Sequence, residues 1–339
     1  MKIACVVGAR PNFMKIAPIL EAMKKYPQVQ PILVHTGQHY DYEMSGVFFE
    51  DLDIPEPDVH LGVGSGSHAV QTAKIMIEFE KVVLEHQPDL VLVVGDVNST
   101  LACALVAAKE NIPVAHVEAG IRSFDRSMPE EMNRLLTDAI SDYLFVPTEH
   151  GCANLSREGI PEEKIFLVGD VMIDTLLQYK DKAATIPILD NLGLQKGNYA
   201  LMTMHRPHNV DIKENLIKIL NAIQEIQSKI SVVFPMHPRT RHRIEKFQLN
   251  EQLSNMKNLI VLEPIGYLRF LNLMMNSKFV LTDSGGMQEE TTVLNIPCLT
   301  LRENTERPET IDGGTNTLVG NDTQRIISES LKILNGKGK

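Results

Sequence analysis

The sequence alternates along its whole length between short apolar runs and longer segments with helical periodicity. In the N-terminal half a turn rich in Gly, Asp or His follows each run, and the runs are Ile3–Val7, Pro31–His35, Leu90–Val94 and Val114–Val117. Continuous apolar strands that alternate with helices are typical of a parallel sheet covered on both faces. Such a sheet binds ligands beyond the carboxyl ends of its strands, which is where these turns fall.

The alternation restarts in the C-terminal half, with runs at Tyr199–Met204, Ser231–Phe234, Leu259–Leu262, Phe279–Leu281 and Pro297–Leu301. Between the halves, residues 169–198 contain one helix and a loose segment, and we expect a hinge there. The chain is long enough for two domains of roughly 150 residues each. The sequence therefore predicts two Rossmann-like, doubly wound α/β domains, residues 1–172 and 173–339, that face each other across a cleft.

The charge balance limits the classes of partner. The chain has 43 acidic and 33 basic residues, which argues against binding to nucleic acid or to an anionic membrane surface. No apolar run approaches the roughly 18 residues of a membrane span, and the N-terminal run is too short for a signal peptide. The four cysteines are scattered and form no CxxC pair, so we expect buried thiols in a reducing compartment. These features predict a cytoplasmic protein without nucleic-acid partners or membrane insertion.

The sharpest phosphate-binding signal lies where the Phe279–Leu281 run meets a helix. Ser284 can supply a hydroxyl, and Gly285 and Gly286 let the backbone amides approach a pyrophosphate closely. Glu289 or Glu290, in the first helical turn, could accept hydrogen bonds from ribose hydroxyls. The alternative is a plain Ser N-cap followed by acids that match the helix dipole.

The first strand–helix turn of the N-terminal domain, GARPN, occupies a similar position. Arg10 and Lys15 could supply the local positive charge that the whole chain lacks. Alternatively, Arg10 lies at the surface and Lys15 extends along its own helix. The other glycine cluster, Gly62–Ser67, follows no convincing strand and is interpreted as a loop before a helix.

Acidic residues gather at the predicted strand ends of the N-terminal half: Asp96, Glu118, Glu130 and Glu131. Carboxylates that converge beside Lys and Arg have their pKa values pushed apart, as general acid–base catalysis requires. Each of them singly could instead be an N-cap, an exposed acid, or one half of a Glu131–Arg134 pair one helical turn apart.

Histidines follow two strands of the C-terminal half. His205 and Arg206 come after the Tyr199–Met204 run, and His237 follows the next one. HxxH spacings occur here, but no HExxH helix or cysteine partner accompanies them, so contact with phosphate or sugar is favoured over a metal site. The sequence contains neither a G-x-S-x-G elbow nor a Walker loop.

Taken together, the ordered motifs GARPNFMKIAPI, HTGQHYDYEM, GDVNSTLA, HVEAGIRSFDRSMPEEMNR, TDSGGMQEE and NTERPET, with the His205–Arg206 pair, resemble the non-hydrolysing UDP-N-acetylglucosamine 2-epimerases. The resemblance extends from residue 2 to about residue 320. It implies a glycosyltransferase-B type fold and the interconversion of UDP-N-acetylglucosamine and UDP-N-acetylmannosamine for cell-surface polysaccharides. It also implies no nicotinamide or metal cofactor and a homodimer. Family members usually continue past ILNGKGK into a further helix.

The resemblance assigns roles residue by residue. It implies catalytic acids at Asp96, Glu118 and Glu130, with Glu131 the adjacent possibility, other essential groups at Lys15 and His205, and UDP binding by Ser284, Glu290 and Arg307, with Arg10 as the first-turn arginine. In bacterial members a Gln–His motif like Gln38–His39 binds a second UDP-N-acetylglucosamine as activator. Two departures are visible: Asn12 stands where many members have Glu, and Tyr40–Glu43 lack the glutamine that follows the activator histidine.

The chemistry of the reaction fits these residues. Carbon 2 of the sugar has no carbonyl beside it, so a plausible route eliminates UDP first, gives a 2-acetamidoglucal, and adds UDP back with protonation of the opposite face. Four other functions use similar residues: a hydrolysing 2-epimerase that releases N-acetylmannosamine, a 2-epimerase of a modified UDP-sugar such as a diacetamido uronate, a retaining glycosyltransferase, and a non-catalytic sugar-nucleotide sensor.

Overall fold

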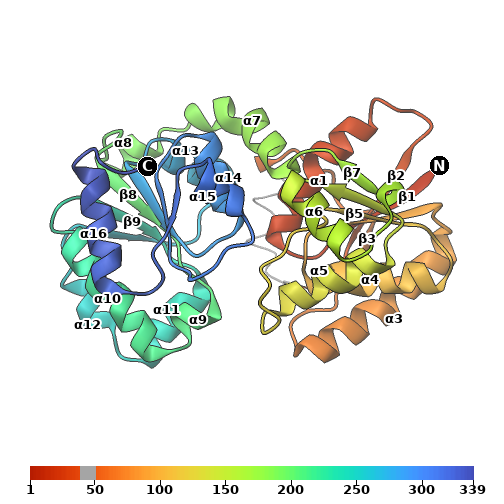
Figure 1. Ribbon diagram of the computed structural model, residues 1–339, viewed down its shortest axis with the longest axis horizontal. Helices are drawn as coiled ribbons and strands as arrows, with labels where there is room; N and C mark the ends of the chain where they lie inside the picture. Colours follow the sequence, from red (N-terminus) through yellow and green to blue (C-terminus); the bar gives the residue numbers. More distant parts are fainter. Residues whose placement is uncertain (39–50) are drawn as a thin grey trace. The chain divides into compact units, whose positions relative to one another are not determined.

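The computed structural model describes residues 1–38 and 51–339 and, for Arg10, the backbone alone (Figure 1). The chain divides into two compact units, residues 1–175 and 176–339, and helix α7 (Val171–Ala184) runs through the boundary. Each unit is built on a single parallel sheet with helical crossovers, so the predicted α/β, doubly wound fold class is confirmed.

The first unit contains a seven-stranded sheet in the order β3-β2-β1-β4-β5-β6-β7. Its strands are β1 (Lys2–Val7), β2 (Gln30–His35), β3 (Val59–His60), β4 (Leu90–Val94), β5 (Val114–Val117), β6 (Tyr143–Val146) and β7 (Ile165–Leu167). Its helices are α1 (Arg10–Met23), α3 (His68–His86), α4 (Asn98–Lys109), α5 (Pro129–Ile140), α6 (Glu149–Arg157) and the 3₁₀ turn η1 (Glu162–Lys164).

Apolar residues on both sides of these strands explain the crossovers. Every residue of β5 is buried, and four of the five residues of β4 are. On one face Ile75 and Phe79 of α3 pack with alanines of α4 over Val91 and Val93. Figure 1 shows α3, α4 and α5 side by side, and α4 contacts both neighbours. The connection through α1 runs the opposite way along the sheet, so right-handed crossover puts α1 on the other face.

The second unit contains a six-stranded sheet in the order β10-β9-β8-β11-β12-β13. Its strands are β8 (Tyr199–Met202), β9 (Ser231–Pro235), β10 (Leu259–Leu262), β11 (Phe279–Thr282), β12 (Cys298–Thr300) and β13 (Asn316–Leu318). Its helices are α8 (Ile188–Leu192), α9 (Pro207–Val210), α10 (Lys213–Ile226), α11 (Pro238–Lys246), α12 (Asn250–Ser254), α13 (Tyr267–Met275), α14 (Gly286–Val293), α15 (Pro308–Asp312) and α16 (Thr323–Leu334). Leu216, Ile219 and Ile223 of α10 pack with Ile326 and Ile333 of α16 in its core.

Each sheet has one point where the strand order reverses. In the first unit this point lies between β1 and β4, which pair in parallel with Val6 opposite Val93. In the second it lies between β8 and β11, with Met202 opposite Leu281. The register brings the carboxyl ends of the paired strands to one edge, and crevices at such reversal points are where open α/β sheets bind ligands.

The sequence patterns missed some elements and shifted others. Strands β6 and β13 were not predicted, and β3, which precedes the glycine cluster, is only two residues long. Helix α1 begins at Arg10, within the GARPN turn itself, because Pro11 has a fixed φ that suits the first helical turn. The cluster Gly62–Ser67 does precede a helix, and the Ser67 hydroxyl accepts a hydrogen bond from Val70 N.

Two further observations concern the cysteines and the character of the helices. All four cysteines are free; Cys5, Cys103 and Cys298 are buried as predicted, whereas Cys152 is half-buried. Cys152 lies at the margin of a small cluster formed by Ala119, Leu144, Val146 and Leu155, which leaves one side of it open. Burial raises the pKa of Cys5 to about 12 and the pKa of Cys298 to about 11. Within residues 1–38 and 51–339, we find no helix with the length and apolar character needed to cross a membrane.

One glycine is required by close approach of two backbones. Gly120 has a φ of +78°, and an added Cβ would lie 2.5 Å from the Gly151 carbonyl oxygen. We expect Gly120→Ala to lower the free energy of unfolding by about 2–5 kcal/mol, because backbone strain and overpacking add. Urea unfolding of Gly159→Ala is the matched control: Gly159 also has a positive φ, but nothing lies within 4 Å of its added Cβ. Equal stability of the two variants would contradict this prediction.

Candidate functional site

Three predicted site residues, Lys15, Asp96 and Glu118, lie around the turn that follows β4. Gly95 has a φ of +70°, and a Cβ there would lie 2.8 Å from Lys15 Nζ and 3.3 Å from Glu118 Oε2. The Lys15 amine donates to the Glu118 carboxylate, and both side chains are buried. The structure therefore brings Lys15 of α1 and Glu118, directly after β5, to the turn that presents Asp96.

Asn12 connects the first strand–helix turn to this place. Its Oδ1 accepts hydrogen bonds from the amides of Gly8 and Ala9, each at 3.0 Å, and its Nδ2 donates to Val94 O at 3.0 Å. Asn12 thus holds the GARPN turn against the end of β4. In the sequence Asn12 stands out only as a departure from the family pattern, because its contact joins segments more than 80 residues apart.

Arg134 of α5 joins two of the predicted acids. Its Nη1 donates to Asp96 Oδ2 at 2.7 Å, while its Nε and Nη2 donate to Glu131 Oε2. The Glu131–Arg134 pair was considered as an alternative to catalysis, but the bond to Asp96 was not foreseen. Arg134 is buried and Asp96 is half-buried, so a cation faces the Asp96 carboxylate from the side of α5.

The two glutamates at the start of α5 differ in surroundings. Glu131 is buried and accepts hydrogen bonds from the amides of Ser123 and Phe124 as well as from Arg134. Burial alone would raise the pKa of Glu131, but these donors outweigh it and hold the pKa below its ordinary value. Glu131 therefore fixes the loop after β5, whereas Glu130 is half-buried on the same helical turn.

A buried network of charged and polar side chains connects β5, α5 and the turn after β4. His116 of β5 contacts Asp138 Oδ1 through Nδ1 at 2.6 Å and Gly95 O through Nε2 at 2.8 Å. Asp138 also pairs with Arg122, whose guanidinium donates to Glu158. Burial opposes ionisation of Asp138, but His116 and Arg122 lower its pKa. These residues were missed, because a histidine inside an apolar strand has no distinctive sequence signal.

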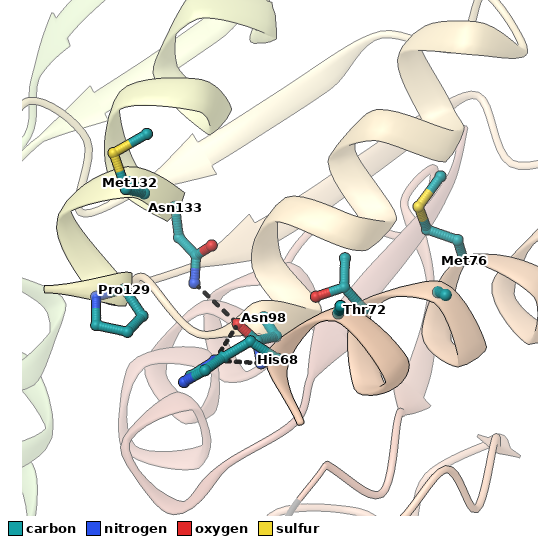
Figure 2. A pocket seen from close by; sticks show the side chains of 9 residues that line it. His68, Thr72, Met76, Asn98, Pro129, Met132 and Asn133 are labelled. Atoms are coloured by element: carbon teal, nitrogen blue, oxygen red, sulfur yellow. Dashed lines mark hydrogen bonds between the residues drawn. The ribbon is translucent and has the colours of Figure 1, made fainter. Parts of the chain in front are cut away.

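A cavity of about 400 Å³ opens beside the Asp96 turn, between the N-terminal ends of α3, α4 and α5. Figure 2 shows Met76 and Met132 on its walls and a polar end where Asn133 and His68 both contact Asn98. Asn133 also donates to Asp96 O at 2.9 Å. The residues that line the cavity are His68, Ala69, Thr72, Ala73, Met76, Asn98, Pro129, Met132 and Asn133.

The proposed activator motif is only partly described. The Gln38 side chain is buried, and its Oε1 accepts hydrogen bonds from the amide and hydroxyl of Ser99. His39 lies outside the described residues, and so does the side chain of Arg10.

In the second unit, Asp283 is the hub of the candidate site. It directly follows β11, is fully buried, and accepts hydrogen bonds from the amides of His205 and Arg206 and from Asn209 Nδ2. His205 Nδ1 lies 2.9 Å from its Oδ1. His237, the N-cap of α11, has its ring 5.5 Å from that of His205. The predicted residues His205, Arg206 and His237 therefore meet at one edge, around an aspartate that was not predicted.

The Ser284–Gly286 turn joins β11 to α14 as expected, but Ser284 does not cap the helix. Gly285 is the N-cap of α14, so the cap residue has no side chain that could bond to the first amides of the helix. The Ser284 amide donates to Thr282 Oγ1 at 3.0 Å instead. The N-cap alternative for Ser284 is therefore wrong, because Gly285 occupies the cap position.

The acids of α14 and the predicted Arg307 have specific partners. Glu290 Oε1 accepts a hydrogen bond from the Tyr267 hydroxyl at 3.0 Å, and both residues are buried. Burial and the Glu290 charge together raise the pKa of Tyr267 far above its ordinary value. Arg307 Nε lies 2.9 Å from Glu289 Oε2. Glu289 and Glu290 are thus held in different directions at the beginning of α14.

Low pH should decrease the stability of the second unit. Burial would raise the pKa of Asp283, but His205 and the backbone amides lower it from 3.8 to about 2. A lowered carboxyl pKa adds stability above the unfolded-state value, and that stability is lost as pH falls from about 4 to about 2. The loss should be about 2 kcal/mol once the pH has fallen to about 2, measured by urea unfolding at pH 5, 4, 3 and 2. Asp283→Asn should flatten this slope, and an unchanged slope in that variant would contradict the assignment.

This chain is similar in sequence to known proteins over nearly its whole length. The family model described as UDP-N-acetylglucosamine 2-epimerase matches residues 21–339. A Methanococcus maripaludis protein named UDP-N-acetylglucosamine 2-epimerase homolog is 50% identical over 98% of this chain and 92% of its own length. A Pseudomonas aeruginosa UDP-2,3-diacetamido-2,3-dideoxy-D-glucuronate 2-epimerase is 44% identical over 99% of this chain and 93% of its own.

A solved structure gives the same answer at the level of the fold. The crystal structure of Methanocaldococcus jannaschii UDP-GlcNAc 2-epimerase, in complex with UDP-GlcNAc and UDP, superposes with a TM-score of 0.92. That protein is 46% identical, and the match covers 98% of this chain and 92% of the solved one. Because the family match and these relatives span nearly the whole sequence, this chain belongs to the UDP-N-acetylglucosamine 2-epimerase family.

Proposed function

We propose that this chain interconverts UDP-N-acetylglucosamine and UDP-N-acetylmannosamine by inverting carbon 2 of the sugar. The observation that carries the proposal is the edge of the first sheet, where Glu118, bonded to Lys15, adjoins the turn that presents Asp96. Carboxylates gathered beside buried cations are suited to proton transfer. The solved relative from M. jannaschii, which binds UDP-GlcNAc and UDP, supports the choice of substrate class.

The proposed reaction begins with elimination. A carboxylate takes the proton from carbon 2 while the bond between carbon 1 and the UDP oxygen breaks, and the released electron pair forms the double bond of 2-acetamidoglucal. UDP then adds back to carbon 1, and a second acid delivers a proton to the opposite face of carbon 2. The cycle needs proton-transfer groups on both faces of one ring, and Asp96, Glu118 and Glu130 are our candidates.

The neighbouring Glu131 is a weaker candidate for this proton transfer. Its carboxylate is buried and accepts several hydrogen bonds, and its lowered pKa makes it a poor proton acceptor. We therefore assign Glu130 the chemical role and Glu131 the task of fixing the loop after β5. Glu131→Gln should consequently act first on stability and Glu130→Gln on turnover.

We propose that residues of the second unit bind most of the UDP group. The amides of Gly285 and Gly286 lie at the start of α14, where the helix dipole favours a phosphate. His205 and His237 lie at the neighbouring strand end, and we assign them, with Arg10, Arg206 and Arg307, to the leaving diphosphate. Glu290 is assigned to the ribose. The elimination and re-addition transfer no electrons to an acceptor, so we propose no cofactor.

Product analysis tests this function. The protein is incubated with UDP-N-acetylglucosamine, and the products are separated by anion-exchange chromatography and identified by proton NMR. A mixture of the two UDP-sugars, reached equally from either one, is the expected result. Free N-acetylmannosamine that accumulates with UDP would support the hydrolysing alternative, and turnover only with an added acceptor would support a glycosyltransferase.

A modified UDP-sugar is the second candidate substrate. The P. aeruginosa relative, named for a diacetamido glucuronate, is 44% identical to this chain, the same identity as a relative named UDP-N-acetylglucosamine 2-epimerase. Overall identity therefore does not separate the two sugars. A panel of both substrates decides: we expect the higher kcat/KM with UDP-N-acetylglucosamine, and a preference for the diacetamido uronate would reassign the enzyme.

We also propose a homodimer formed through α3. This helix exposes Val70, Ile77 and Leu84, which are 49%, 58% and 62% exposed and spaced seven residues apart. A row at this spacing is suited to pairing with a second helix. Ile77→Glu should yield a monomer in light scattering after gel filtration, while Leu177→Glu, at an exposed leucine of α7, should not. A monomeric wild-type protein would refute the dimer.

Four free thiols favour a reducing compartment, so we propose a cytoplasmic location.

A further inference from the structure

The link between Asp283 and His205 is a feature of the second unit that the function proposed above does not use. Asp283 is 0% exposed. Its two oxygens accept from the His205 amide at 3.1 and 3.0 Å, from the Arg206 amide at 2.8 Å and from Asn209 Nδ2 at 3.1 Å. This is an unusually complete set of donors for one buried carboxylate, and it fixes the main chain at the base of the His205 side chain.

The same carboxylate also fixes the imidazole ring. His205 Nδ1 lies 2.9 Å from Asp283 Oδ1, so Nδ1 carries a proton and donates it in a hydrogen bond. Nε2 lies on the opposite side of the ring. The His205 side chain is 37% exposed although its partner is fully buried. The buried Asp283 carboxylate therefore holds the ring at Nδ1, and the opposite edge of the ring is accessible to a ligand.

The Asp283 carboxylate places a negative charge beside the His205 ring. The pKa of Asp283, lowered to about 2, keeps its carboxylate ionised at neutral pH. The donors that reach this carboxylate besides His205 are neutral amides, from the backbone and from Asn209. The ring of His237, 5.5 Å away, is the neighbouring titratable group, and its Nδ1 is engaged by the Arg239 amide. A buried anion next to an imidazole stabilises the imidazolium and selects its orientation.

We propose that Asp283 is a positioning residue that holds His205 as an imidazolium with Nε2–H directed at the leaving diphosphate. This inference rests on the proposed function, in which UDP leaves and returns. Negative charge grows on the diphosphate oxygen as the bond to carbon 1 breaks, and a fixed cationic donor stabilises that charge more in the transition state than in the bound sugar nucleotide. No proton changes place in this step: the Nε2 proton stays on the ring.

The test is a double-mutant cycle with a matched control. If Asp283 acts through His205, Asp283→Asn should lower kcat roughly 10²-fold and change KM for the UDP-sugar little. In a His205→Gln background the same substitution should cost almost nothing more, because the ring that it positions is gone. Asp211→Asn is the control: Asp211 is also an aspartate with a pKa lowered to about 2, but it pairs with Arg239 and Arg243 instead of His205.

A spectroscopic measurement separates this proposal from the proposed function. The ¹⁵N resonances of His205, assigned by their loss in His205→Gln, report the protonation of each ring nitrogen without any turnover. In the complex with UDP we expect protons on both Nδ1 and Nε2 of the wild-type protein, and in Asp283→Asn we expect a mixture of tautomers. A neutral His205 ring in the UDP complex, in either tautomer, or additive losses of kcat in the double mutant, would overturn the proposal. Absence of epimerisation with an Nδ1-protonated His205 would overturn the proposed function alone.

Discussion

Glu118→Gln should abolish proton exchange at carbon 2, with a loss of rate of about 10³–10⁴-fold. Gln has nearly the shape of Glu but cannot accept a proton, and general acid–base groups typically contribute factors of this size. Glu118 also neutralises the buried Lys15 amine, so removal of its charge leaves a cation without its carboxylate partner at this edge of the sheet. Exchange is measured as deuterium uptake from the solvent, and UDP affinity is measured separately by calorimetry.

The stability of the variant must be measured with its activity. Breaking a buried ion pair costs about 3–5 kcal/mol, and the double variant Lys15→Met with Glu118→Gln should recover part of that stability without recovering exchange. Glu110→Gln, at an exposed position just after α4, is the matched control and should behave as the wild type. Exchange at the wild-type rate in Glu118→Gln would remove this carboxylate from the mechanism.

Asp96→Asn should lower exchange by about 10²–10⁴-fold while the protein stays folded. The Asn oxygen can still accept the hydrogen bond from Arg134 Nη1 that Asp96 now accepts at 2.7 Å. The fold around α5 is thereby kept, and only the charge and the proton-accepting capacity are lost. UDP affinity should change little, because our assignment puts the nucleotide grip in the second unit.

Two comparisons make the Asp96 result specific. Asp181→Asn, at an exposed position of α7, should leave exchange unchanged. Arg134→Lys should have an intermediate effect, since Lys keeps a cation but cannot bond to both Asp96 and Glu131 as Arg134 does. A full loss of UDP binding in Asp96→Asn would mean that Asp96 holds the nucleotide instead of moving a proton.

The periodicity of the sequence predicted most of the fold, because buried parallel strands must be continuous and apolar. The run Leu90–Val94 coincides with β4, and Val114–Val117 coincides with β5. Strand β13 escaped prediction because Asn316–Leu318 is short and mostly polar, and its Asn316 is buried only because Thr300, Thr310 and Gln288 satisfy its amide. Hydrogen bonds of this kind depend on tertiary structure and leave no periodic signal.

The sequence predicted those site residues that lie at the ends of apolar strands, because the strands themselves could be predicted. Glu118 follows an apolar run directly, and Asp96 and Ser284 follow theirs within three residues, so their places at the sheet edges were expected. The contacts that orient the site residues were not predictable, because the partners belong to distant segments: Lys15 and Glu118 are 103 residues apart, and His205 and Asp283 are 78 residues apart. Arg134 and Asp138 resemble ordinary charges of an amphipathic helix until the packing of α5 directs them inward.

The most direct test of the central claim is incubation of the protein with UDP-N-acetylglucosamine in deuterium oxide. Elimination and re-addition predict deuterium at carbon 2 in both recovered UDP-sugars, together with formation of UDP-N-acetylmannosamine. Epimerisation with carbon 2 still carrying its original hydrogen, or no incorporation at all, would contradict the proposed chemistry.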